Sequence, residues 1–217
     1  IRYNSIGDKM KDILLLGKKI KVEDCEIVLD YDATSDSDFT KLFQVMAGNW
    51  YHDGEYLIGE ELENKGGILF SKEKFNFNVL LTIEMATVLP ATRDLNAVWC
   101  ASWDSNTDYL KEAYVCGLNG WYDNLSGIER CGENGFYTST SLYEYKLGEF
   151  IKMDCGSIGG HCFMYVDGKL ITEICDPHPL YEGHIGISPY CTKLKIKRIT
   201  VRKIHFSERH QYYDPEF

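Results

Sequence analysis

Short runs of alternating apolar and polar residues, separated by Gly, Asp and Asn, repeat along most of this chain. Side chains alternate between the two faces of a β-strand, so each run is typical of a strand that turns one face to a core. Long amphipathic patterns that could form crossover helices are nearly absent. The sequence therefore predicts an all-β fold, an antiparallel two-sheet β-sandwich.

The clearest run covers residues 75–85, where apolar residues fall on one face and polar residues, including Glu84, fall on the other. Residues 96–103 predict a second strand with Trp99 and Trp103 on one face, and residues 112–118 predict a third. Between residues 117 and 137 the chain is rich in Gly and Asn, which favours an irregular loop.

The later part of the chain continues the pattern, with predicted strands in 149–155, 161–175, 183–190 and 193–206. Within the second of these, Asp167-Gly168 between β-rich flanks is a strong hairpin signal. In the last run the apolar phase slips by one near Lys197-Arg198, which predicts a β-bulge there. Residues 8–16 fit a short helix or a strand equally well.

We expect one domain over residues 1–217, with residues 1–37 as an N-terminal strand or arm and residues 207–217 as a tail. The sequence has no apolar stretch of the length that spans a membrane. It starts at Ile1 rather than Met, so removal of a leader peptide is left as an open alternative.

The charge and cysteine content narrow the classes of partner and compartment. The formal net charge of -10 disfavours nucleic acid, because phosphate binding requires a basic face. The eight cysteines include no Cys-x-x-Cys pair, and several lie in apolar runs where free cysteine packs as a small hydrophobe. We therefore expect free thiols, no zinc site and a cytoplasmic location.

Several segments, taken in order, carry a family resemblance. These are Asp38-Phe39, Gly48-Asn49-Trp50-Tyr51-His52-Asp53-Gly54-Glu55-Tyr56-Leu57, Gly67-Ile68-Leu69-Phe70-Ser71 with the strand ending at Glu84, Asn96-Ala97-Val98, Tyr165-Val166-Asp167-Gly168-Lys169, Gly183-His184-Ile185-Gly186-Ile187 and Ile199-Thr200-Val201. Over residues 38–204 the chain resembles the concanavalin A-like lectin/glucanase superfamily. Within it the chain is most similar to the 3-keto-disaccharide hydrolase domain and related bacterial sugar-utilisation proteins. The resemblance implies a jelly-roll sandwich and a carbohydrate-active function.

The resemblance leaves open whether the protein is an enzyme. Laminarinase-like members of the superfamily carry a Glu-x-Asp-x-x-Glu strand, and this sequence has no such pattern. One hypothesis is cleavage of a small saccharide or glycoside by acid/base chemistry, as in a glycoside hydrolase or a lyase. The alternative is a non-catalytic module that binds carbohydrate or protein. An aromatic surface could also make a homo-oligomer interface.

For the enzymatic hypothesis, the candidate proton carriers are Glu84, on a polar strand face, and His178, between two prolines. The alternatives are a solvated carboxylate and a hydrogen-bonded loop histidine. The candidate substrate-binding residues come from aromatic, histidine and loop positions and are Trp103, Trp121, Arg130, His161, Tyr181 and Asn96.

The sequence predicts no metal site and no cofactor. Histidines and Glu84 lack close ligand spacing. The acidic positions Asp30, Asp32, Asp36 and Asp38 could supply oxygens to a structural calcium ion, but a solvated turn explains them better than a complete ligand loop does.

Overall fold

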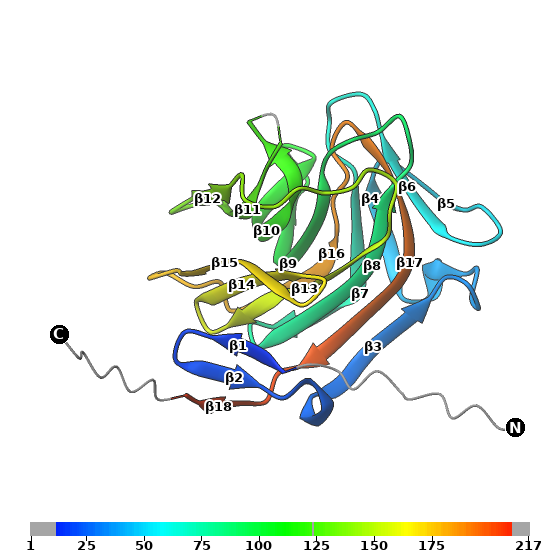
Figure 1. Cartoon of the computed structure of the whole chain (residues 1–217). Helices are drawn as coiled ribbons and strands as arrows, with labels where there is room; N and C mark the ends of the chain where they lie inside the picture. Colours follow the sequence, from blue (N-terminus) through cyan, green and yellow to red (C-terminus); the bar gives the residue numbers. More distant parts are fainter. Residues whose placement is uncertain (1–11, 123, 210–217) are drawn as a thin grey trace, which may run out of the picture.

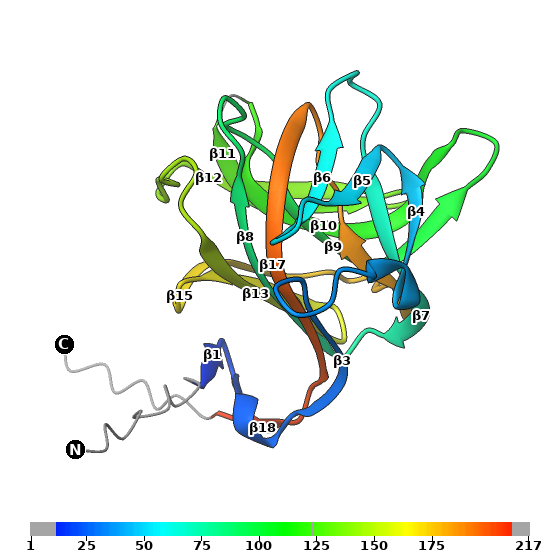
Figure 2. The same ribbon diagram turned by 90° about the vertical axis from the view of Figure 1, so that its right-hand side faces the viewer.

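The computed structural model describes residues 12–122 and 124–209, which form an all-β sandwich (Figure 1). Within them, strands are interrupted only by turns, loops and two short 3-10 helices, Val22–Asp24 and Phe39–Lys41. Three antiparallel sheets result, here called sheets I, II and III. Sheets I and II are the two layers of the sandwich, and sheet III is a small addition at one end (Figure 2).

Sheet I has the strand order β12-β11-β10-β9-β16-β7-β4. Its strands are β4 (Phe43–Ala47), β7 (Ile68–Asn76), β9 (Leu95–Asp104), β10 (Tyr109–Trp121), β11 (Leu125–Cys131), β12 (Phe136–Thr140) and β16 (Glu182–Ile187). Consecutive strands β9 to β12 form a meander, whereas β16 enters from the far end of the chain between β9 and β7.

Sheet II has the order β15-β14-β13-β8-β17-β6-β5, and β3 also pairs with β17. Its strands are β3 (Glu26–Asp32), β5 (Asn49–His52), β6 (Leu57–Glu61), β8 (Val79–Thr87), β13 (Ile151–Ile158), β14 (His161–Val166), β15 (Lys169–Cys175) and β17 (Thr192–Lys203). Strand β17 is long enough to pair with β8 along one side and with β6 and β3 in succession along the other.

The main core lies between sheets I and II. Val79, Leu81 and Ile83 of β8 point into it, as alternate positions of one strand must. From sheet I it receives Trp99 and Tyr114, whose ring centroids lie 5.4 Å apart. The Trp99 indole Nε1–H donates to Ser157 Oγ at 3.0 Å, so the buried polar atom that joins the two sheets is satisfied.

Sheet III consists of β1 (Ile13–Leu15), β2 (Lys18–Ile20) and β18 (Phe206–Glu208). It covers a second apolar cluster on the outer face of sheet II, where Leu80 and Phe163 meet Leu15 and Ile20. This arrangement explains why β8 buries residues on both faces at its start, although only one of them faces the main core.

The predicted sandwich, the hairpin and the bulge are confirmed. Asp167 and Gly168 both have positive φ, 49° and 75°, as the tight turn between β14 and β15 requires. The pairing of β17 with β8 shifts register between Ile196 and Arg198, where the sequence predicted a bulge. Residues 13–15 of the ambiguous N-terminal stretch form a strand, while residues 8–11 and most of the predicted tail, 210–217, lie outside the described residues.

Three local predictions are wrong. Residues 75–85 are the end of β7 and the start of β8, joined by a turn at Phe77 and Asn78. Trp99 and Trp103 lie on opposite faces, because Cys100 has a positive φ of 48° and joins Trp99 in the main core. The stretch 117–137 is the end of β10, all of β11 and the start of β12 rather than an irregular loop.

Candidate functional site

A hollow of about 250 Å³ lies on sheet I and combines carboxylates with aromatic side chains. Its lining residues are Asp94, Asn96, Tyr109, Leu110, Val115, Gly120, Trp121, Glu129, Cys131, Ser188 and Tyr190. Leu110 and Val115 belong to the apolar cluster on the face of sheet I that points away from the main core, here called the outward face. We call this feature the Trp121 hollow.

Strand register explains how residues far apart in sequence meet there. Val115 of β10 pairs with Val98 of β9 on one side and with Glu129 of β11 on the other. Paired residues of antiparallel strands point to the same face, so Glu129 shares the outward face with the two valines. Asn96 lies two residues from Val98 and therefore points the same way.

Asp94 is the most buried carboxylate of the hollow, with 4% of its surface exposed. Its Oδ2 accepts from Arg93 Nε at 2.8 Å, and its Oδ1 accepts from Asn96 Nδ2 at 3.1 Å. Burial raises the pKa of Asp94 to about 6, and the bonds from Asn96 and Arg93 only partly oppose that rise. A carboxyl group in this range can carry a proton close to neutral pH.

Glu129 is the second carboxylate and is half-buried. Its Oε2 accepts a hydrogen bond from Trp121 Nε1 at 2.8 Å, which fixes both the carboxylate and the indole. Cys131 lies beside its other oxygen, with Sγ to Oε1 at 3.7 Å. Burial, followed by the Glu129 charge, raises the pKa of Cys131 to about 12, so this thiol is protonated at neutral pH.

Tyr109 lines the Trp121 hollow, and burial and the nearby ionisable groups shift its pKa. Burial, and then Cys131, Glu129, Tyr190 and Asp94, raise its pKa to about 12. Its ring lies against Gly66, where a Cβ atom would come within 2.7 Å of Tyr109 Cε2. The loop before β7 therefore needs glycine at position 66, because a larger residue would displace the Tyr109 ring.

Asn96 contributes an unsatisfied acceptor. Its Oδ1 makes no hydrogen bond, although the residue is only 6% exposed. The amide lies over Gly117 of β10, where any Cβ would overlap Oδ1. A buried acceptor without a partner costs free energy, and this oxygen is covered by the backbone at Gly117 rather than open to the hollow.

Of the residues predicted for the site, Trp121 and Asn96 lie together in this hollow. Trp103 is half-buried on the same outward face but packs edge-on against Phe70, with ring centroids 6.4 Å apart. Tyr181, 67% exposed, lies against the edge of Phe77.

Arg130 and His161 are buried in polar networks. Arg130 is 4% exposed, points away from the hollow and pairs with Asp176 at 3.0 Å. His161 bonds Glu173 through Nε2 at 2.9 Å, and its Nδ1 lies 3.3 Å from Lys18 Nζ of sheet III. Their predicted contact with substrate stays a prediction.

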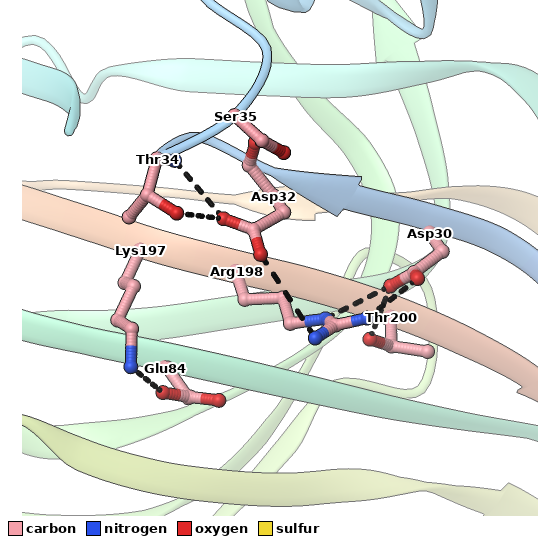
Figure 3. Close-up of polar contacts among 8 residues, drawn as sticks. All are labelled: Asp30, Asp32, Thr34, Ser35, Glu84, Lys197, Arg198 and Thr200. Carbon is pink, nitrogen blue, oxygen red and sulfur yellow. Dashed lines mark hydrogen bonds and ion pairs between the residues drawn. The ribbon is translucent and has the colours of Figure 1, made fainter. Parts of the chain in front are cut away.

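Glu84 lies in a different hollow, on the outer face of sheet II, and Figure 3 shows its contact with Lys197. Its Oε2 accepts from Lys197 Nζ at 3.0 Å. Beside it, Arg198 makes a two-point ion pair with Asp30 at 2.7 and 3.1 Å, and Thr200 donates to the same carboxylate at 2.9 Å. This hollow, of about 210 Å³, is lined by Thr82, Glu84, Lys152, Arg198, Thr200 and Arg202.

His178 is exposed on the loop between β15 and β16, and its backbone N–H donates to Asp176 Oδ1 at 2.8 Å. It belongs to neither the β8 strand of Glu84 nor the lining of either hollow. Catalysis by Glu84 and His178 therefore stays a prediction, without a shared site to support it.

The acidic positions of the calcium hypothesis are engaged in local bonds. Asp32 accepts from Thr34 at 2.6 Å (Figure 3), Asp36 pairs with Lys41 at 3.2 Å, and Asp38 accepts from Thr40 at 2.6 Å. Across the described residues, no group of three or more His, Cys, Asp or Glu is placed to hold a metal ion. None of the eight cysteines, all of which are described, is in a disulfide.

Asp94 and Glu129 were missed from the sequence. Glu129 lies in the stretch that was predicted as a loop. Arg130, the next residue, is charged but buried, so the polar and apolar residues of this strand do not alternate as expected. Asp94 precedes its strand and has a positive φ of 57°, so no alternation includes it. Its one signal was the Asp-x-Asn spacing, which puts the two side chains within bonding distance.

Comparison with solved structures agrees with this architecture. A protein of unknown function with a galectin-like fold from Bacillus subtilis has a TM-score of 0.64 and 13% identity, covering 82% of this chain and 96% of that one. The fold is concanavalin A-like. An endo-β-1,3-glucanase from Pyrococcus furiosus has a TM-score of 0.61 and 12% identity, covering 89% and 98% of the two chains.

A carbohydrate binding module is also similar in structure to this chain. The carbohydrate binding module CBM66 from Bacillus subtilis has a TM-score of 0.58 and 14% identity, covering 74% of this chain and 94% of that one. No protein-family model and no curated protein sequence matches the chain. Within the described residues, no helix is long and apolar enough to cross a membrane.

Proposed function

We propose that this protein is carbohydrate-active: it binds a saccharide in the Trp121 hollow and cleaves a glycosidic bond there by acid/base chemistry. The observation that carries the proposal is a pair of carboxylates, Asp94 and Glu129, in one aromatic-walled hollow. Sugar rings stack on aromatic faces, and glycoside hydrolysis commonly uses two carboxyl groups in different environments. The solved neighbours with this fold, a β-1,3-glucanase and a carbohydrate binding module among them, fit the proposal.

The two carboxylates take different roles in the proposed reaction. Asp94, whose pKa of about 6 keeps it partly protonated near neutral pH, gives its proton to the glycosidic oxygen as the bond from that oxygen to the anomeric carbon breaks. Glu129 accepts a proton from the water that attacks the anomeric carbon. Trp121 fixes the Glu129 carboxylate through its indole N–H.

A non-catalytic binding role is the second candidate, and one observation favours it. Both oxygens of Asp94 are already engaged, by Arg93 and Asn96, so the proton donor is held away from a ligand unless Arg93 moves. The Arg93 side chain is 39% exposed, which leaves it room to move. The saccharide site itself is the same in both candidates.

Binding and turnover measured on the same samples separate the candidates. The ligand panel is mono- and disaccharides, their 3-keto and uronic forms, β-1,3- and β-1,4-glucan oligosaccharides, and calcium as a separate arm. Thermal shift reports binding, since a ligand of the native state raises the melting temperature. Release of reducing ends reports cleavage.

Asp94→Asn and Glu129→Gln are expected to keep binding and to lose turnover, whereas Trp121→Ala is expected to lose binding. Glu84→Gln and His178→Ala test the alternative assignment of the proton carriers. Binding without turnover in the wild type would support the non-catalytic role. Full activity in both hollow variants would refute the assignment of Asp94 and Glu129.

A further inference from the structure

Two tyrosines form an exposed aromatic pair beside the Trp121 hollow. Tyr122 is 72% exposed and Tyr137 is 53% exposed. Their hydroxyls are hydrogen-bonded at 3.1 Å, and their ring centroids lie 5.8 Å apart with the rings tilted by 42°. Two large exposed rings that are held in a fixed arrangement, and that are not part of a core, are typical of a binding surface.

Strand register places this pair on the same face as the hollow. Tyr137 of β12 is the register partner of Glu129 of β11, and such partners point to the same side of the sheet. Its neighbour Phe136 points the other way and packs against the main core. Tyr122 directly follows Trp121, whose indole bonds Glu129. The tyrosine pair therefore continues the outward face from the Trp121 and Glu129 side of the hollow towards the sheet edge.

The size of the hollow argues for a ligand that extends beyond it. At about 250 Å³ it lies below the usual range of roughly 300–1,000 Å³ for small-molecule sites. The ring faces and hydroxyls of a tyrosine pair match the apolar faces and hydroxyls of a sugar, since tyrosine has an apolar body and a polar tip. The hydroxyl–hydroxyl bond holds the two rings in place before binding, which lowers the ordering cost.

We infer that Tyr122 and Tyr137 form a second stacking surface, so that the ligand is an oligosaccharide of at least two residues rather than a monosaccharide. This inference rests on the proposed function and specifies its ligand class. One sugar residue occupies the Trp121 hollow, and the chain continues over the tyrosine pair towards β12. Each stacked residue then adds affinity, and affinity rises with chain length.

Calorimetric titration with β-1,3- and β-1,4-linked glucose oligosaccharides of increasing length tests the inference. For the linkage that binds, we expect the wild type to gain about tenfold in affinity when the chain grows past one residue. The double variant Tyr122→Ala/Tyr137→Ala should lose that gain and keep its affinity for the single sugar. Tyr51→Ala, a tyrosine of sheet II that is 36% exposed, is the matched control and should behave as wild type.

Each other outcome overturns a distinct statement. Chain-length gain that persists in the double variant overturns the second stacking surface and leaves the proposed function standing. No binding of any sugar by the wild type overturns both. A wild-type dimer by light scattering that becomes a monomer in the double variant reassigns the pair to an interface between copies. Retained melting temperatures show that the variants still fold, which the exposure of both side chains leads us to expect.

Discussion

The buried carboxyl of Asp94 makes a quantitative prediction about stability. An unfolded chain loses this proton near pH 3.8, whereas the folded protein keeps it up to about pH 6. Between those values the folded state binds more protons than the unfolded state. The contribution of Asp94 to the free energy of unfolding is therefore largest at low pH and falls as the pH rises through about 6. At about 1.36 kcal/mol for each pH unit, this corresponds to about 3 kcal/mol.

The variant Asp94→Asn removes the titrating group and keeps an oxygen that can accept from Asn96. We expect the pH dependence of its unfolding free energy to lack the fall of about 2 kcal/mol between pH 4 and pH 6.5 that Asp94 gives the wild type. Urea unfolding at half-unit pH steps measures it, with the two curves subtracted so that other groups cancel.

Asp53→Asn is the matched control. Backbone N–H groups of Tyr56 and Glu55 lower the pKa of Asp53, so its titration contributes below the pH 4 to 6.5 window. Its difference curve against wild type should be flat in the window. If the Asp94→Asn difference curve is also flat, or rises with the opposite sign, the reasoning that burial dominates at Asp94 is refuted.

Three further substitutions test the structure elsewhere, each by urea unfolding at pH 7. Arg130→Ala strips the ion pair from buried Asp176 and should cost about 3–5 kcal/mol, whereas a loss below about 1 kcal/mol would show that water replaces the partner. Gly117→Ala drives a methyl group into Asn96 and should cost about 1–3 kcal/mol while also weakening saccharide binding; an unchanged binding constant would separate Asn96 from the site. Gly168→Ala meets open space but keeps φ of 75°, so about 1 kcal/mol should be lost from backbone strain alone, and a neutral result would contradict the assigned turn.

Sequence reasoning reached the fold because local chemistry and global pattern agreed. Asp167-Gly168 specifies its turn because both residues adopt positive φ. The alternation of apolar and polar residues shifts by one at Lys197-Arg198, where the strand pairing changes register. It failed where the alternation misleads. The turn at Phe77 and Asn78 lies inside a pattern that continues without a break, because Phe77 itself packs against the main core.

The site was harder to predict because register, not sequence spacing, assembles it. Trp121 and Asn96 were predicted as substrate-binding residues, and the structure places both in one hollow, while their contact with a ligand stays a prediction. Glu129 joins them only because β11 pairs with β10 at Val115, a relation between strands that a single sequence does not display. The same limit applies to Glu84, whose polar strand face leads to an ion-paired surface of sheet II.

The position of β17 has a consequence for synthesis of the protein on the ribosome. This strand, Thr192–Lys203, is the shared neighbour of β3, β6 and β8, although those strands are made far earlier. Until it emerges, a nascent chain holds three strands with open hydrogen-bonding edges, which are sites for pairing with other chains. Closure across such long sequence separations is intrinsically slow. A chain stopped before residue 192 would therefore leave these edges open, and the arrival of one strand would cover all three.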